Sequence, residues 1–328
     1  MQSVRELSRR GQPLAPDAPT ATINNPAWWV DGEPTPARDR LHRRLLEEAR
    51  EVNPQVERQR RAVVLAGPPG AGKSTVLKDV LGQDGSSYRV VDADEFKRSL
   101  LREAQADGSY QSWLMPKAVR EREAAGERFF PLELAALVHE ESSYLARRMR
   151  ADAIEGGENV VIDAVLSSEG TARELSRTLT SAGYDVSVVD VEVPYEVSQE
   201  RIRARWEQAH ATSLSGGDPF GGRWVPSEYA RSVFDGPHGR SWPEAVAEKL
   251  AEECPAVSSY RVYRTSEEAE HRAKEKGRGR VSPRLETHMQ RPSYGRPLVS
   301  TDAAVREKTV RASRPPKPHH RGGNSLES

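Results

Sequence analysis

Short apolar runs alternate with longer stretches of helical periodicity between residues 62 and 263. The apolar runs predict five strands, at residues 62–66, 89–92, 159–163, 186–193 and 260–263. The stretches between them predict helices at residues 73–81, 95–104, 132–153, 170–182 and 197–211. Strands that alternate with helices are typical of a parallel sheet covered on both faces. The pattern therefore predicts an α/β fold built on a doubly wound parallel sheet.

Both ends of the chain lack this pattern. Residues 1–40 are rich in Pro, Ala and Asp, and we expect a mostly irregular segment whose Trp28 and Trp29 dock on a neighbouring surface. Residues 41–266 form the predicted folded domain, which starts with an amphipathic helix over residues 41–50. Residues 267–328 mix Arg, Lys, Pro, Ser and Gly, which predicts a disordered basic tail that catalysis does not need.

The overall charge argues against two classes of partner. The 49 basic residues balance the 49 acidic residues, so the chain lacks the positive field of a dedicated nucleic-acid-binding or membrane-surface protein. Its single cysteine, Cys254, excludes an intrachain disulfide and a four-cysteine zinc site. No run of about eighteen apolar residues is present and Met1 is followed by no apolar signal core, so we expect a cytoplasmic protein.

Residues 67–75 match the phosphate-binding pattern G-x-x-x-x-G-K-[ST] between a predicted strand and a predicted helix. The residues of this P-loop are Gly67, Pro68, Pro69, Gly70, Ala71, Gly72, Lys73, Ser74 and Thr75. Backbone N–H groups of such a loop surround the phosphate oxygens at the positive end of the following helix. Lys73 would neutralise the β and γ phosphates of ATP, and Ser74 would place its hydroxyl on Mg²⁺. The sequence thus predicts a P-loop phosphotransferase that uses ATP and Mg²⁺.

Two carboxylates follow the second predicted strand, whose end faces the P-loop in this type of fold. An acceptor hydroxyl needs a carboxylate to take its proton as the phosphoryl group arrives, and Asp94 is placed for that role. Asp92 is its rival as base, and could instead hold the Mg²⁺ shell. Either residue could also simply cap the helix that begins at Glu95.

With these residues the chain resembles the zeta toxins of bacterial toxin-antitoxin pairs, over residues 41–264. Residues 92–97 read DADEFK, similar to the family pattern Asp-x-Asp-x-Phe-[Lys/Arg], and the family's proposed general base falls on Asp94. Residues 162–165 read IDAV where the family has Ile-[Glu/Asp]-Gly-Thr, so Asp163 matches the acid near the acceptor sugar. The Gly and Thr are absent, which leaves the acceptor open.

The resemblance also implies phosphate and acceptor contacts further along the chain. Arg205, in RWE, and Arg223, in RWVP, match the two family arginines that reach the phosphates. Arg223 lies within a predicted lid loop over residues 213–225. The nearby Arg201 and Arg203 are assigned to a solvated face. His139 and Ser142 match a substrate-side His and Ser of the family. An ordinary core or surface histidine without a role in the site is an equal alternative for His139.

The resemblance implies a kinase that phosphorylates a sugar hydroxyl of UDP-N-acetylglucosamine, or of a related nucleotide-linked metabolite. Such a kinase would be the toxin of a toxin-antitoxin pair, with an antitoxin protein as partner. The helix over residues 41–50 could act as an antitoxin in cis, but packing against the sheet is the preferred interpretation. One alternative is a kinase of another small acceptor, such as an antibiotic or a nucleotide. Another is a non-catalytic regulatory protein that depends on a nucleotide.

Overall fold

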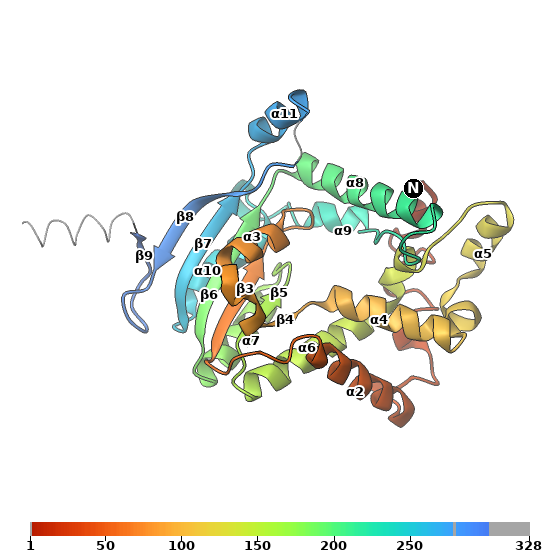
Figure 1. The fold of residues 1–328 in the computed structure, drawn as a ribbon, viewed down its shortest axis with the longest axis horizontal. Helices are drawn as coiled ribbons and strands as arrows, with labels where there is room; N and C mark the ends of the chain where they lie inside the picture. The colour runs from red at the N-terminus through yellow and green to blue at the C-terminus, as the bar shows by residue number, and fades with distance from the viewer. Residues whose placement is uncertain (1, 278–279, 302–328) are drawn as a thin grey trace, which may run out of the picture.

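The computed structural model describes residues 2–277 and 280–301. Its core is a seven-stranded sheet of order β4-β5-β3-β6-β7-β8-β9 (Figure 1). The strands are β3 (Arg61–Ala66), β4 (Arg89–Val91), β5 (Val160–Asp163), β6 (Asp185–Glu192), β7 (Val257–Arg264), β8 (Arg284–Gln290) and β9 (Val299–Ser300). Strands β3 to β7 pair in parallel, whereas β8 and β9 pair antiparallel at one edge. The five predicted strands correspond to β3–β7.

Helices cover both faces of the sheet, which confirms the predicted doubly wound α/β fold. The main helices are α3 (Lys73–Leu81), α4 (Ala93–Ala106), α6 (His139–Glu155), α7 (Glu169–Ser181), α8 (Tyr195–Leu214) and α10 (Trp242–Glu253). Alternate β3 residues belong to different core clusters: Val64 packs in the cluster that includes α6, α7 and α10, and Val63 in the cluster that includes α3. This alternation follows from side chains pointing to opposite faces along a strand.

The prediction of a helix over residues 132–153 is wrong for its first turns. Residues Pro131–Val138 form the 3-10 helix η4, and α6 begins only at His139. Further short elements have no counterpart in the prediction. They are the 3-10 helices η2 (Gly82–Ser87) and η5 (Pro237–Gly239), the π-helical turn η3 (Tyr110–Leu114) and the helix α5 (Lys117–Ala124). Helix α9 (Ser227–Ser232) begins directly after Pro226.

The N-terminal segment is largely irregular but packed. It contains α1 (Gln2–Leu7), the 3-10 turn η1 (Thr22–Asn24) and the hairpin of β1 (Trp29–Val30) and β2 (Glu33–Pro34), and Leu14 within it is fully buried. Helix α2 (Pro36–Glu51) begins five residues before the predicted Leu41, because Thr35 caps it and Pro36 occupies its first position.

A buried charge cluster fixes α2 against α6. Glu141 is fully buried and accepts hydrogen bonds from Arg38 Nε at 2.6 Å and Nη2 at 2.8 Å. His42 Nε2 lies 2.6 Å from the same carboxylate. These contacts hold the pKa of Glu141 down at about 2, although burial alone would raise it. Helix α2 therefore packs on α6, where packing against the sheet was expected, and no α2 residue lines the P-loop cleft described below.

The prediction of a disordered tail is wrong for those of its residues that the structure describes. Residues Glu267–Glu275 form α11, β8 pairs along the length of β7, and β9 follows β8. Most β8 side chains are exposed or half-buried, so the strand is held by backbone pairing and carries no apolar alternation for sequence analysis to detect. Residues 302–328 of the predicted tail lie outside the described residues.

Two buried carboxyl groups lie side by side on β6 beneath α10. Asp190 is fully buried and Glu192 is 3% exposed. Ser241 Oγ donates to Glu192 Oε1 at 2.9 Å, whereas neither oxygen of Asp190 has a donor among the described residues. Burial and the charge of Glu244 raise the pKa of Asp190 to about 7. Burial and the charge of Asp190 raise the pKa of Glu192 to about 9. We infer that the pair holds protons at neutral pH.

Candidate active site

The P-loop connects β3 to α3 and packs closely against β6. Gly67, Gly70 and Gly72 all have positive φ, of 128°, 77° and 100°. A Cβ on Gly67 would lie 2.1 Å from the backbone oxygen of Val191, so this position admits only glycine. Lys73, the first residue of α3, donates to the Gly67 carbonyl at 2.9 Å. The conformation of the predicted phosphate-binding loop therefore depends on its close packing against β6 as well as on its own glycines.

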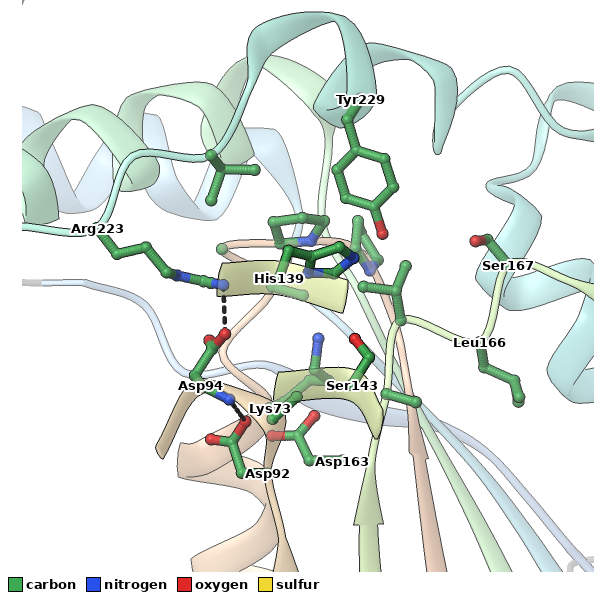
Figure 2. Close-up of a pocket in the computed structure, with 18 of the residues that line it drawn as sticks. Lys73, Asp92, Asp94, His139, Ser143, Asp163, Leu166, Ser167, Arg223 and Tyr229 are labelled. Carbon is green, nitrogen blue, oxygen red and sulfur yellow. Dashed lines mark hydrogen bonds and ion pairs between the residues drawn. The ribbon is translucent and has the colours of Figure 1, made fainter. Parts of the chain in front are cut away.

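Two carboxylates lie at the carboxyl ends of the adjacent strands β4 and β5. Asp92 caps α4, since its Oδ1 accepts from the Asp94 backbone N–H at 2.8 Å. Burial and the negative charge of Asp94 raise the pKa of Asp92 to about 6. Burial also raises the pKa of Asp163, against the opposing charge of Lys73. Both carboxylates line the same cleft as the P-loop (Figure 2).

Asp94 is paired with two cations. Its Oδ1 accepts from Arg223 Nη1 at 2.6 Å and from Lys97 Nζ at 3.0 Å, and its side chain is 38% exposed. Partial burial would raise the pKa of Asp94, but Arg223 and Lys97 hold it below the ordinary value. Figure 2 shows Arg223 reaching Asp94 from the segment above the cleft. Lys97 is a site residue that the sequence analysis missed, although it ends the DADEFK motif.

The predicted lid loop is irregular from Ser215 onward, and of its residues only Arg223, Trp224 and Val225 line the cleft. Asp218 accepts from Arg98 of α4 at 2.9 and 3.2 Å, and the Phe220 carbonyl accepts from the Leu132 backbone N–H at 2.8 Å. These contacts hold the following Arg223 above Asp94. Arg205, an exposed residue of α8, lines the same cleft. The structure thus brings both predicted arginines to the P-loop side.

The assignment of Arg201 to a solvated face is wrong. Its side chain is 6% exposed and forms a buried ion pair with Glu270 of α11. Arg203, by contrast, is exposed as expected. The sequence analysis could not detect the Arg201 pair, because its partner lies in the segment that was expected to be disordered.

The structure places only one of the two predicted acceptor-side residues of α6 in the cleft. His139 lines the cleft, and burial together with the charge of Lys97 lowers its pKa. Ser142 is fully buried and its Oγ donates to the His139 carbonyl at 2.8 Å, so it does not face the cleft. Its neighbour Ser143 does, and so does Tyr229 from α9 (Figure 2). One residue along a helix turns a side chain by about 100°, which is why Ser143 lines the cleft and Ser142 does not.

The β5–α7 connection forms the wall of the cleft that follows Asp163. Residues Ala164, Val165 and Leu166 line it, and Leu166 adopts a positive φ of 57°. The Val165 carbonyl accepts from the Gly67 backbone N–H at 3.3 Å, which ties this wall to the P-loop. The apolar Ala164-Val165 pair therefore lines the cleft beside the P-loop.

The cleft has a volume of about 1510 Å³. A pocket for one small ligand measures about 300–1,000 Å³, so this cleft has room for a nucleotide and a second substrate. Part of its wall comes from Ser8, Arg10 and residues 15–17 of the N-terminal segment, which the sequence analysis did not connect to the site. The Arg10 backbone N–H donates to Glu228 at the rim at 3.3 Å.

The residues at the P-loop fit a magnesium ion held mainly by nucleotide phosphates. Among the described residues no group of three or more His, Cys, Asp or Glu side chains could hold a metal ion alone. Mg²⁺ does not need such a cage, because it keeps several waters and takes one or two protein oxygens. Such oxygens come from the exposed hydroxyl of Ser74 and from the Asp92 carboxylate, which forms no ion pair with any residue that the structure describes.

The chain is similar to known proteins in its family and in its fold. The family model described as zeta toxin matches residues 43–274. A solved AvrRxo1-ORF1:-ORF2 complex matches with 18% identity and a TM-score of 0.51, over 84% of this chain and 73% of that chain. The PezAT toxin-antitoxin structure from Streptococcus pneumoniae matches with 14% identity and a TM-score of 0.45, over 71% of this chain and 78% of that chain. At 18% identity the likeness to the AvrRxo1-ORF1:-ORF2 complex is one of fold. A search of curated proteins finds no significant match.

Within the residues that the structure describes, no helix is long and apolar enough to cross a membrane.

Proposed function

The chain belongs to the zeta toxin family, and we propose that it is a kinase that transfers the γ-phosphoryl group of ATP to an acceptor hydroxyl. One observation carries the proposal. A P-loop lysine, the carboxylates of Asp92, Asp94 and Asp163, and the arginines Arg205 and Arg223 all border a single cleft. A hydrolytic switch needs no second pocket beyond the phosphates, whereas this cleft has room for an acceptor beside Asp163 and His139.

The residues divide into a phosphate side and an acceptor side. The P-loop and Lys73 bind the β and γ phosphates, and Arg205 stabilises the charge on the transferring group. Ser74 and Asp92 would hold Mg²⁺, which neutralises phosphate charge when it is bound. Asp163, His139 and Ser143 face the acceptor, and Ser143 takes the place that the sequence analysis gave to Ser142.

The Asp94–Arg223 pair suggests how the nucleotide prepares the base. Among the described residues, Arg223 is bonded to the Asp94 carboxylate. A triphosphate offers it stronger and multiple acceptors, so nucleotide binding would draw Arg223 away and leave Asp94 closer to its ordinary basicity. Asp94 then takes the proton of the acceptor hydroxyl while the oxygen attacks the γ-phosphorus, and ADP leaves. Lys97 stays bonded to Asp94 and keeps its carboxylate oriented.

The acceptor is proposed to be UDP-N-acetylglucosamine or a related nucleotide-linked metabolite, phosphorylated on a sugar hydroxyl. Family membership supports this choice, and the size of the cleft allows it. The Ala164-Val165 wall favours an acceptor that makes fewer polar contacts at this position than a Gly-Thr pair provides. Another small hydroxyl acceptor, such as an antibiotic or a nucleotide, is the second candidate, because it would use the same phosphate side.

We also propose that the chain is the toxin of a toxin-antitoxin pair and that its partner is an antitoxin protein. Family membership supports this proposal. Its test is co-purification of the chain with the product of a neighbouring reading frame, and recovery of growth when both are expressed together.

The test of the kinase proposal is whether ADP release depends on the acceptor. Purified protein with ATP and Mg²⁺ should release ADP slowly, and at least ten times faster once UDP-N-acetylglucosamine or an active fraction of a metabolite extract is added. The Lys73→Ala variant is the control. ADP release at the same rate with and without every fraction would favour a nucleotide-dependent regulatory protein.

A further inference from the structure

The outward-facing carbonyls of the P-loop meet hydrogen-bond donors from α8. A loop that turns its N–H groups toward phosphates points carbonyls the other way, and those carbonyls need partners of their own. Ser198 Oγ donates to the Pro69 carbonyl at 2.7 Å. Arg201 Nη1 donates to the carbonyls of Gly70 at 3.2 Å and Ala71 at 3.4 Å. Helix α8 thus supports three consecutive P-loop carbonyls.

The same arginine also holds the C-terminal part of the chain. Its Nε and Nη2 each donate to a different Glu270 oxygen at 3.2 Å, and Nη2 donates to the Val281 carbonyl at 3.0 Å. Glu270 in turn accepts from the Val281 backbone N–H at 3.1 Å. The side chains of Arg201 and Glu270 are 6% and 7% exposed, so the pair is shielded from water.

We call residues 265–277 and 280–283 the C-terminal strap. Residues 280–283 line the cleft, and Pro283 Cγ lies 3.4 Å from where a Cβ on Gly72 would be. Lys274 of α11 also pairs with Glu200 of α8. In Figure 1, α11 lies beside the first turns of α8. The family match ends at residue 274, so the cleft-lining residues of the strap lie beyond it.

We propose that Arg201 and Glu270 are positioning residues for the P-loop, and that the strap they hold is part of the nucleotide site. This inference rests on the proposed function. A loop whose carbonyls are already fixed loses less freedom when its N–H groups bind phosphate, which favours affinity. Arg280 adds an exposed positive charge to the cleft wall, close enough to act on Arg205. The ligand of this region is the negatively charged triphosphate of a nucleotide.

The experiment compares nucleotide affinity in matched variants of the full chain. Arg201→Gln and Glu270→Gln remove one partner each of the buried pair. Arg203→Gln and Glu268→Gln are the controls, since they change exposed residues of the same two helices. The dissociation constant of the non-hydrolysable analogue AMP-PNP with Mg²⁺ should rise about tenfold or more in the first two variants. It should stay within about twofold in the controls, and kcat at saturating ATP should change less than KM for ATP.

A second measurement uses the unmodified protein and does not depend on how well the variants fold. Hydrogen exchange should slow in peptides that cover residues 280–290 when AMP-PNP binds. Exchange that is unaffected there, or affinities in Arg201→Gln and Glu270→Gln equal to those of the controls, would overturn the inference while the kinase proposal stands. If AMP-PNP does not bind, or binds equally well to Lys73→Ala, the kinase proposal falls and this inference falls with it.

Discussion

The buried pair of Asp190 and Glu192 predicts a protein that loses stability as pH rises through the neutral range. In the unfolded chain both carboxyl groups lose their protons near pH 4. In the fold burial raises the pKa of Asp190 to about 7 and that of Glu192 to about 9. Between these limits the folded state holds protons that the unfolded state has released, so the free energy of unfolding falls with increasing pH.

The size of the effect follows from the number of protons. Each proton held only by the folded state lowers the free energy of unfolding by about 1.4 kcal/mol per pH unit. Two such protons between pH 5 and pH 7 set an upper limit of about 6 kcal/mol. Relaxation of the site reduces this value, and we expect a loss of about 2 to 5 kcal/mol. This is a large part of the stability of an ordinary domain, which is about 5–15 kcal/mol.

The variant Glu192→Gln tests this reasoning. Its amide oxygen can keep the hydrogen bond from Ser241, and its NH₂ group can donate to Asp190. Urea denaturation followed by circular dichroism at pH 5, 7 and 8 should show less than half of the parent's loss of stability. At pH 8 the variant should be more stable than the parent by about 2 kcal/mol. Glu252→Gln, an exposed change on α10, is the control. A parent protein whose stability is constant or rises from pH 5 to pH 8, or a Glu192→Gln variant with an unchanged slope, would refute the account of the pair.

Three further predictions concern the cleft and the α2–α6 contact. Asp94→Asn removes the proton acceptor but keeps the shape of the side chain, so turnover at saturating substrates should fall by a factor of about 10² to 10⁴ while AMP-PNP still binds. Asp92→Asn should weaken Mg²⁺-nucleotide affinity, and added Mg²⁺ should partly restore the rate. Normal turnover in Asp94→Asn beside a dead Asp92→Asn that still binds nucleotide would reverse the assignment of the base. Lys73→Ala should abolish transfer with the circular dichroism spectrum unchanged, and activity within about tenfold of the parent would remove the P-loop from catalysis. Glu141→Ala should lower the free energy of unfolding by about 3–5 kcal/mol because it leaves Arg38 buried without its partner; a loss below 1 kcal/mol in urea denaturation would contradict the buried cluster.

The parts of the site that lie close together in sequence could be predicted. The P-loop is defined by residues within one strand-turn-helix unit, and Asp92 and Asp94 follow directly from the end of the next strand along the chain. Such features depend on local spacing, which a sequence displays. The parallel pairing of the five strands could also be predicted, because strands that alternate with helices are typical of a parallel sheet.

The parts that depend on distant partners could not be predicted. Arg201 is surrounded by charged and polar residues in α8, and only its contacts with Glu270 and the P-loop carbonyls explain its burial. Glu270 lies in a segment without apolar periodicity, so the sequence around either residue gives no indication that the two form a pair. Strand β8 is stabilised by pairing with β7 at the sheet edge, which leaves little trace in its side chains. The contribution of Arg10 to the cleft has the same cause, since tertiary packing alone brings the N-terminal segment there.

The central claim is that this cleft moves a phosphoryl group from ATP to an acceptor hydroxyl. The most direct measurement follows γ-labelled ATP with the purified protein, Mg²⁺ and UDP-N-acetylglucosamine, and then with fractions of a metabolite extract. The account predicts that the label appears on an organic acceptor, that the transfer requires Asp94 and Lys73, and that little label is released as inorganic phosphate. Label found only as inorganic phosphate, with every acceptor fraction and in amounts unaffected by Asp94→Asn, would contradict the account.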